Sequence, residues 1–285
     1  MSEQQKNSVY KGRLLKHRIG ICLSTIAMFV GLFFLAWILM TLFVRGFGSI
    51  SLDVFTKSTP PAGEPGGLWN AIFGSLVIVA AATFIATPIG ILAGIYLSEF
   101  GDRKWFGELT RFVADIMLSA PSIVIGMFIF IAYVAQVKHH SGWAGSIALS
   151  LIAIPVVMRT TDNMLALVPT SLREAAFALG APRWKVAIFI RLKAVRAGIL
   201  TGILLAVARI SGETAPLMYT AMSNQFFNSD MNKPMANLPM VISNFAMTPY
   251  EDLKGLAWAG ALILTFGVLA LNILSRTVFA QKNQH

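Results

Sequence analysis

Residues 68–98 read LWNAIFGSLVIVAAATFIATPIGILAGIYLS and contain no Asp, Glu, Lys or Arg. These 31 residues exceed the roughly 20 apolar residues that a helix needs to cross the ~30 Å hydrocarbon core of a bilayer. An open sheet would leave backbone N–H and C=O groups unsatisfied in lipid, so a helix is expected. The sequence therefore predicts an integral membrane protein of the all-α class.

Five further stretches have the same apolar character, so six transmembrane helices are expected. Residues 19–44, 116–137, 141–158 and 255–275 contain no charged residue, and Ala197–Met222 contains Arg209 and Glu213. The expected divisions are a cytoplasmic basic tail (1–18), a first span (19–44), an external loop (45–67), a five-helix core (68–279) that includes a cytoplasmic connection (159–196), and a C-terminal tail (280–285).

The overall composition agrees with a membrane protein and excludes several other classes. The 285 residues are 56% hydrophobic and 13% charged, whereas an average soluble domain has roughly 25% charged residues. The strong apolar bias and the single cysteine, Cys22, exclude a disordered chain, a disulfide scaffold and an ordinary soluble enzyme. The net charge of +10 does not indicate a nucleic-acid partner, because the basic residues occupy the connections between apolar stretches.

Lys and Arg are distributed unevenly between the connections, and this bias predicts the orientation. Seventeen fall in the two tails and in the connections after the second and fourth spans, against five on the opposite side. Both termini are therefore expected in the cytoplasm. The stretch 19–44 is longer than the ~7–15-residue core of a secretory signal peptide and no small-residue cleavage site follows it, so it is expected to be an uncleaved anchor. The basic segment before it is expected either to form a short interfacial helix or simply to hold the N-terminus inside.

The cytoplasmic connection 159–196 is too polar for lipid and too long to be an unstructured loop, so helices are expected in it. Ser171 and Glu174 have the spacing of a capping box, in which the serine accepts the N–H of residue 174 and the glutamate reaches back. Gly180 is suited to ending this helix, and Pro182 is suited to the first turn of the next. Local chemistry therefore predicts a helix–turn–helix in the cytoplasm.

The same connection resembles the EAA loop of ABC-importer permeases. The matching residues are Glu174, Ala175, Ala176, Gly180, Ile190 and Leu192, and Lys193 stands where the family pattern has proline. The resemblance implies that the connection docks on an ATPase subunit, with Glu174 as a contact and Gly180 as the turn between two short helices. The alternative is that Glu174 serves only the capping box.

Arg209 and Glu213 lie four positions apart in the stretch Ala197–Met222, so they are expected to share one helix face. Intramembrane charges cost at least ~2.5–3.5 kcal/mol each, so they either form a structural ion pair or line an anion pathway. Gly212 and Pro216 favour the pathway, because they predict a helix break whose backbone N–H groups can face an anion. The hydroxyl groups that would add to this pathway belong to Ser211 and Thr214.

The segment Ala208–Pro216 reads ARISGETAP and resembles the ARxxGETAP segment of phosphate ABC-transporter permeases of the PstA type. The resemblance runs from about Gly66 to Leu274. It implies the MetI-like permease fold of a multi-pass protein in the bacterial cytoplasmic (inner) membrane, forming half of a phosphate pore. It also implies a second, homologous permease subunit, two ATPase subunits that bind ATP and magnesium, and an external phosphate-binding protein.

Three other functions are alternatives. A permease for another oxyanion, such as sulfate or molybdate, does not account for the Glu-Thr-Ala-Pro segment, and a secondary transporter using Glu213 as proton carrier gives the EAA spacing no role. An intramembrane enzyme would need a catalytic constellation that the spans lack. Within the phosphate interpretation, Glu213 either pairs with Arg209 or accepts a hydrogen bond from protonated phosphate, which would reject sulfate.

The sequence predicts neither a cofactor nor a metal site on this chain. It contains no G-x-x-x-x-G-K-[ST] loop, so ATP is expected on a partner and the chain is expected to be a transport subunit rather than an enzyme. His139 and His140 are adjacent, and no cysteine or carboxylate cluster joins them. A metal site is therefore not expected.

Overall fold

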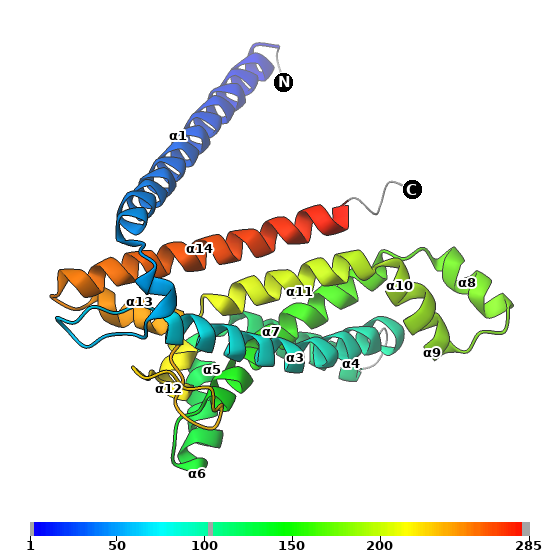
Figure 1. Cartoon of the computed structure of the whole chain (residues 1–285). Helices are drawn as coiled ribbons and strands as arrows, with labels where there is room; N and C mark the ends of the chain where they lie inside the picture. Colours follow the sequence, from blue (N-terminus) through cyan, green and yellow to red (C-terminus); the bar gives the residue numbers. More distant parts are fainter. Residues whose placement is uncertain (1–2, 102–104, 281–285) are drawn as a thin grey trace.

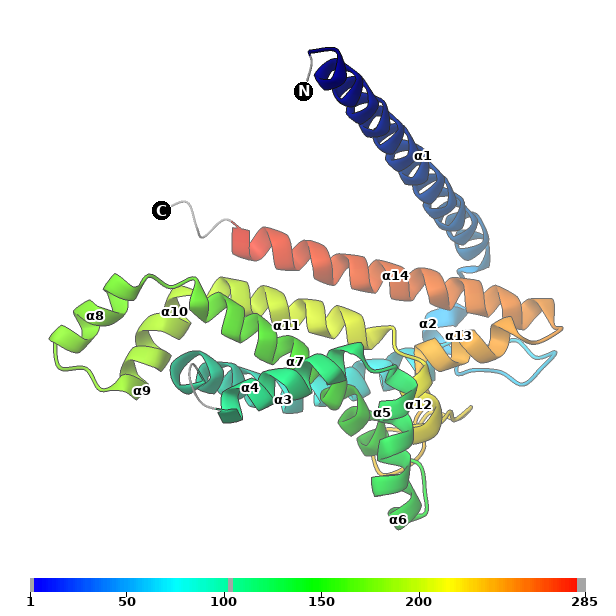
Figure 2. The same cartoon turned by 180° about the vertical axis from the view of Figure 1, so that it is seen from behind.

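The computed structural model describes residues 3–101 and 105–280, and within these ranges it contains helices and loops but no strand. Four long helices lie side by side and form the body of the molecule (Figures 1 and 2). They are α3 (Trp69–Phe100), α7 (Gly142–Ala166), α11 (Arg196–Ser211) and α14 (Glu251–Ala280). The expected all-α architecture is confirmed for the described residues.

The helices α3 and α7 pack closely along their length because small residues line the contact. A methyl group at Gly90 would lie 2.7 Å from Cβ of Val157, and one at Gly94 would lie 2.6 Å from Cβ of Thr161. Both glycines face α7 four residues apart, a spacing that allows two membrane helices to approach closely. This contact continues into the largest buried cluster of the molecule, where Ile78 and Leu149 are fully buried.

The stretch 116–137, expected as one span, is divided between two helices that meet at an angle. Helix α4 (Trp105–Ser119) ends before Pro121, and α5 (Ser122–Ile129) begins after it, with a bend of 103° between them. Proline has no N–H to donate and disfavours the helical conformation of the residue before it, so it accounts for the interruption. The chain continues as a π-helical segment, η1 (Phe130–Val134), and a short helix, α6 (Ala135–Val137).

The expected span Ala197–Met222 is also interrupted. Helix α11 ends at Ser211, and a short helix, α12 (Ala215–Thr220), follows. Among the described residues, four helices are long and apolar enough to cross a membrane, and the bent pair of α4 and α5–α6 makes a fifth. Five of the six expected spans therefore have a helix or a bent pair that can cross, whereas the stretch Ala197–Met222, divided into α11 and α12, is not among them, and six crossings stay a prediction.

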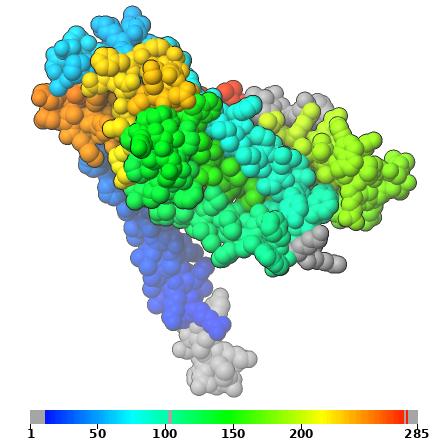
Figure 3. Space-filling model, turned by 90° about the horizontal axis from the view of Figure 1, so that it is seen from below, coloured from blue at the N-terminus to red at the C-terminus, as the bar shows by residue number. Residues whose placement is uncertain are grey.

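The first helix, α1 (Glu3–Ser49), stands apart from the rest of the chain (Figure 3). It is continuous from within the expected basic tail to beyond residue 44, so the first residues of the expected external loop are helical. Its only extensive packing within the described residues is with α14, near its C-terminal end, where Leu42 is buried. A methyl group at Gly46 would lie 2.9 Å from Cβ of Leu262 on α14.

At one end of the molecule, the loops after α1 and α12 are folded against the helices. Here lie α2 (Asp53–Thr56) and α13 (Leu238–Ala246), opposite the end toward which α14 runs (Figure 1). The buried Asn70 amide donates to the Thr59 hydroxyl oxygen at 2.9 Å and to the backbone oxygen of Asn224 at 2.9 Å. Asn237 begins α13 by accepting the Met240 N–H at 3.1 Å. The stretch 223–254 is therefore a folded cap rather than a spacer.

The expected C-terminal tail, residues 280–285, lies outside the described residues except for the backbone of Ala280. The expected basic tail, residues 1–18, begins with residues 1–2 that also lie outside the described ranges.

Candidate functional site: a helix break and a cytoplasmic connection

The break within the stretch Ala197–Met222 is a tight turn between α11 and α12. Gly212 donates its N–H to the Arg209 oxygen at 3.3 Å, and Glu213 donates to the Ile210 oxygen at 3.3 Å. These i to i−3 bonds close the last turn of α11, and helical pairing resumes where Met218 donates to the Thr214 oxygen at 3.2 Å. Pro216 lies in the first turn of α12, where its missing N–H costs no helical bond.

Arg209 and Glu213 do not share a helix face, which corrects the expectation from their spacing. The α-helix ends at Ser211, so Glu213 has left the helical register that would place it one turn above Arg209. Within the part of the chain that the structure describes, no ion pair joins them. Arg209 is exposed and Glu213 is half-buried. The structural ion pair is therefore absent from this arrangement.

Ser211 lines a cavity of about 1090 Å³ between α3, α11, α13 and α14, whereas Arg209, Glu213 and Thr214 are not among its lining residues. Most of the side chains that line the cavity are aliphatic, and the polar side chains among them carry hydroxyl groups. The Ser211 hydroxyl donates to the Val207 oxygen at 2.7 Å. The hydroxyl of Thr87 on α3 is buried without a hydrogen-bond partner among the described residues. The other hydroxyl-bearing residues of the lining are Ser75 and Thr83.

Helix α12, which follows the break, is held by α5 and α7 through glycines. A methyl group at Gly126 on α5 would lie 2.5 Å from Cα of Pro216. One at Gly145 on α7 would lie 2.9 Å from Cβ of Ala221. Where α7 begins, the Ser141 N–H donates to the Thr220 oxygen at 3.1 Å. The position of the break is therefore set by contacts with residues 70 to 90 positions earlier in the chain.

The cytoplasmic connection contains two helical pieces, which project beyond the ends of α3, α7 and α11 (Figures 1 and 2). The first is α8 (Thr170–Ala178). The second consists of α9 (Arg183–Lys185), a π-helical segment η2 (Val186–Arg191), and α10 (Leu192–Ala194). The expected helix–turn–helix is confirmed. Lys193 lies inside α10, so the helix continues where the family pattern has proline.

The turn after α8 has the expected glycine, but the capping box does not form. Gly180 has φ +79° and donates to the Phe177 oxygen at 2.9 Å, while Ala181 donates to the Ala176 oxygen at 3.1 Å. These two bonds make a Schellman motif, which requires the left-handed conformation that glycine adopts without strain. At the other end, α8 begins at Thr170 after Pro169, and no side chain caps it.

The missing capping box leaves Glu174 without a structural role in α8. Ser171, which the sequence predicted as the capping residue, is already inside the helix, one position after its first residue, Thr170. Glu174 and Ala175 are exposed, whereas Ala176 is buried. Two large apolar side chains of the connection are also open to the surface, since Leu179 is 88% exposed and Trp184 is 56% exposed. The connection therefore presents an acidic residue beside unburied apolar groups, as a protein-docking surface does.

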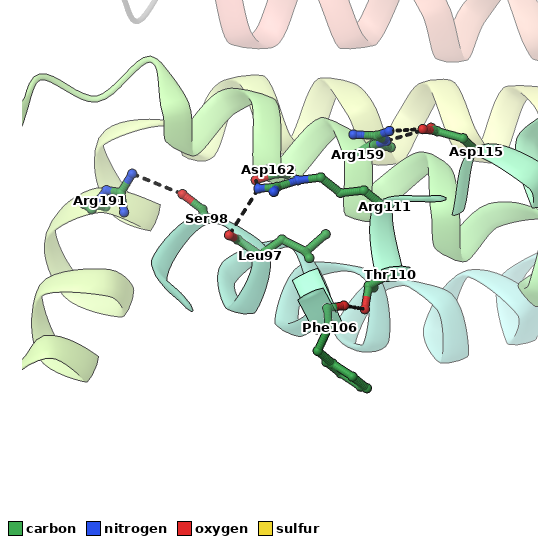
Figure 4. Close-up of polar contacts among 9 residues, drawn as sticks. All are labelled: Leu97, Ser98, Phe106, Thr110, Arg111, Asp115, Arg159, Asp162 and Arg191. Atoms are coloured by element: carbon green, nitrogen blue, oxygen red, sulfur yellow. Dashed lines mark hydrogen bonds and ion pairs between the residues drawn. The ribbon is translucent and has the colours of Figure 1, made fainter. Parts of the chain in front are cut away.

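Three arginine–carboxylate pairs join the connection and the helices next to it. Figure 4 shows two of them, Arg111 with Asp162 and Arg159 with Asp115, together with Arg191 of the third. Arg191 on η2 pairs with Glu99 at the end of α3, and both side chains are buried. Arg111 on α4 pairs with Asp162 on α7, with Nε and Oδ2 separated by 3.1 Å. The third pair joins Arg159 on α7 to Asp115 on α4, with Nε and Oδ1 separated by 3.0 Å.

The sequence-based interpretation treated these arginines only as charges that orient the chain. One local signal was available, because Arg191 interrupts the apolar run Val186–Leu192 and a buried arginine requires a partner. The partner itself was not predictable, because Glu99 lies 92 positions away.

Residues 86–281 match the family of binding-protein-dependent transport system inner membrane components. A phosphate transport system permease protein PstA from Pasteurella multocida is 56% identical over 98% of this chain and 99% of its own length. The PstA protein of Yersinia pestis is 53% identical, over 99% and 95% respectively. Both relatives therefore align with nearly the whole chain.

Two solved structures share the fold at low sequence identity. A bacterial ABC transporter involved in the import of the acidic polysaccharide alginate superposes with a TM-score of 0.67 at 13% identity, covering 99% of this chain and 100% of its own. An inward-facing MetNI methionine ABC transporter superposes with a TM-score of 0.62 at 16% identity, covering 75% of this chain and 95% of its own. These likenesses establish the MetI-like permease fold.

Proposed function

Because this chain belongs to the family of binding-protein-dependent transport system inner membrane components and is 53–56% identical to PstA proteins, we propose that it is the permease subunit of a phosphate ABC importer. It is a multi-pass protein of the bacterial cytoplasmic membrane. The observation that carries this function is the near-full-length similarity to phosphate transport system permeases. A permease for another oxyanion accounts for that similarity less well.

We propose an assembly in which this chain forms half of the pore. A second, homologous permease subunit would supply the other half, two ATPase subunits would bind ATP and magnesium, and an external protein would deliver phosphate. The lack of a G-x-x-x-x-G-K-[ST] loop supports this division, because the chain has no such device for cradling ATP phosphates. No cofactor is assigned to this chain.

The helix break supplies the proposed phosphate contact. Arg209 is exposed, and no ion pair with Glu213 occupies its guanidinium in the described part of the chain. A guanidinium presents a planar fork of donors, which suits two oxygens of a tetrahedral anion. Ser211, Thr214 and the half-buried Glu213 would complete the contact, with Gly212 and Pro216 keeping the helix interrupted at this point.

The exposed surface of α8 supplies the proposed coupling contact. Glu174 and Ala175 would dock on the ATPase subunit, while Ala176 packs inward and Gly180 turns the chain between the two helical pieces. ATP binding and hydrolysis would then move the connection and switch the access of the pore from the outside to the cytoplasm. In this proposal ATP is hydrolysed on the ATPase subunit, and this chain contributes only the docking contact and its half of the pore.

Reconstitution of the complete complex in proteoliposomes tests the proposed function. With external phosphate-binding protein and internal ATP, we expect phosphate uptake that stops when ATP is omitted. A complex purified through this chain should contain a second permease and an ATPase subunit. Uptake that survives ATP depletion and collapses with a protonophore would contradict an ATP-driven importer and favour a proton-coupled transporter.

A further inference from the structure

We propose that Arg191, paired with Glu99, is the positioning residue that transmits movement of the cytoplasmic connection to helix α3. This inference rests on the proposed function and assigns a coupling role to a pair inside the protein, away from the ATPase surface. It is carried by the contacts of one guanidinium group, by its burial, and by the position of α3 along the cavity.

The Arg191 guanidinium joins three elements of the structure. One of its terminal nitrogens donates to the Glu99 carboxylate, and the other donates to the Ser98 hydroxyl oxygen at 3.1 Å. The second nitrogen also donates to the backbone oxygen of Leu165 at 2.7 Å. Ser98 and Glu99 form the last turn of α3, and Leu165 lies in the last turn of α7. The connection is thus attached to the ends of two long helices through one side chain, and Figure 4 shows its contact with Ser98.

Burial makes this attachment specific. The side chains of Arg191 and Glu99 are 7% and 4% exposed, so separating them would leave each charge out of water without its partner. A buried ion pair is weak evidence for stability, because well-packed apolar residues often replace one without loss. The pair is better explained by the geometry of its hydrogen bonds. The planar guanidinium of an arginine can hold three acceptors in fixed directions, whereas the ammonium group of a lysine cannot.

Within the described residues, no ion pair joins α8, α9 or α10 to the long helices. The extensive packing of α8, α9 and α10 is with η2, which carries Arg191 at its end. Segment η2 is a π-helix, a geometry that often occurs at functional sites. A displacement of α8 by the ATPase subunit therefore reaches the spans through η2, and Arg191 is the charged side chain by which η2 holds them.

Helix α3, which would receive this movement, is one of the four helices that line the cavity. Helix α3 contributes Thr83, Thr87 and other residues to the cavity that also contains Ser211 from α11. A second arginine holds the same end of α3, because Arg111 donates to the Leu97 oxygen at 3.3 Å while pairing with Asp162 on α7. A pull on Arg191 would therefore move the joined ends of α3 and α7 together, relative to α14 on the other side of the cavity, and change the width of this cavity.

The test uses the full complex in proteoliposomes and measures phosphate taken up per ATP hydrolysed. Single variants strand a buried charge, so the informative variant is the double substitution Glu99→Gln with Arg191→Met, which removes both charges and retains similar volume. Lys193→Ala is the matched control, because Lys193 is an exposed cation two residues away in the same connection.

We expect the double variant to assemble and hydrolyse ATP, while phosphate uptake per ATP falls at least tenfold; the control should match the unsubstituted complex. Arg191→Lys should give an intermediate ratio, because it restores the charge without the fork. An unchanged ratio in the double variant would overturn the proposal. Failure of the double variant to assemble, with the control intact, would assign the pair to folding and also overturn it. Absence of phosphate uptake by the unsubstituted complex would instead contradict the proposed function.

Discussion

Gly126 on α5 lies directly against Pro216 on α12, so close that a methyl group at Gly126 would be 2.5 Å from the Cα of the proline. The two residues are 90 positions apart in the chain, and each belongs to an interrupted span. A proline lies at or next to each interruption, and the helices that follow the two interruptions, α5 and α12, meet at this contact. The bend after α4 and the break after α11 are therefore parts of one arrangement, in which α5 supports α12.

Gly126→Ala should displace α12 and lower phosphate uptake. The new methyl group meets backbone atoms that cannot rotate away, and overpacking of this kind costs roughly 1–3 kcal/mol. Thermal unfolding of the purified complex should show the destabilisation, and uptake should fall in parallel. Gly31→Ala is the control, since no atom lies within 4 Å of a methyl group placed at that glycine. An unchanged melting temperature for Gly126→Ala would show that α12 is not held by this contact.

Arg209→Ala should reduce phosphate uptake by about tenfold to a hundredfold, the loss expected for hydrogen bonds to a charged group worth roughly 1.5–3 kcal/mol. Because Arg209 is exposed and makes no ion pair with Glu213, the folded protein should be no less stable without it. Initial uptake rates at equal amounts of membrane-inserted complex provide the measurement, with Arg18→Ala on α1 as the control. Full uptake by the Arg209 variant would remove this residue from the anion pathway.

Glu213→Gln should weaken discrimination against sulfate. A carboxylate can accept a hydrogen bond from protonated phosphate, whereas sulfate at neutral pH has no proton to donate and would leave a half-buried acceptor unpaired. Competition of excess sulfate with labelled phosphate uptake should therefore be stronger in the variant than in the unsubstituted complex. If selectivity is the same in both, the external binding protein selects the anion and Glu213 does not.

Glu174→Ala and Ser171→Ala should have different effects, because the capping box is absent. Glu174 is an exposed residue of the proposed docking surface, so its loss should lower ATP-driven uptake and ATPase copurification while leaving the thermal stability of this chain unchanged. Ser171 lies inside α8 and caps nothing, so its replacement should alter neither, instead of costing the ~1 kcal/mol of a lost cap. Normal uptake by the Glu174 variant would contradict docking through this residue.

Asn70→Ala should loosen the folded cap at the outer end of the protein. The Asn70 side chain accepts the Thr59 N–H at 3.0 Å and donates to the backbone oxygens of Asn224 at 2.9 Å and Gln225 at 3.1 Å. Removing it strands buried polar groups, at a cost of roughly 1–3 kcal/mol. Limited proteolysis from the outer side should cut residues 223–236 faster in this variant. An unchanged cleavage rate would show that the loop is held by other contacts.

Features that depend only on neighbouring residues could be predicted from the sequence. Charge-free stretches identified the apolar helices because the cost of placing charge in lipid applies at every position. Gly180 and Pro182 located the turn in the cytoplasmic connection, since left-handed backbone and a missing N–H are properties of single residues. Gly212 and Pro216 bracketed the break after α11 for the same reason, and Pro121 stands at the bend between α4 and α5.

Which charged side chains meet depends on how the helices pack, and the sequence did not predict it. The spacing of Arg209 and Glu213 suggested a pair, but the end of α11 at Ser211 separates their registers. Conversely, nothing in the local sequence joins Arg191 to Glu99, which are brought together by the packing of α3, α7 and η2. Hydropathy and turn chemistry act over a few residues, whereas an ion pair requires two distant backbones to be in place first. The positions of the helices along this chain therefore follow from local sequence, whereas the ion pairs between helices follow from how those helices pack.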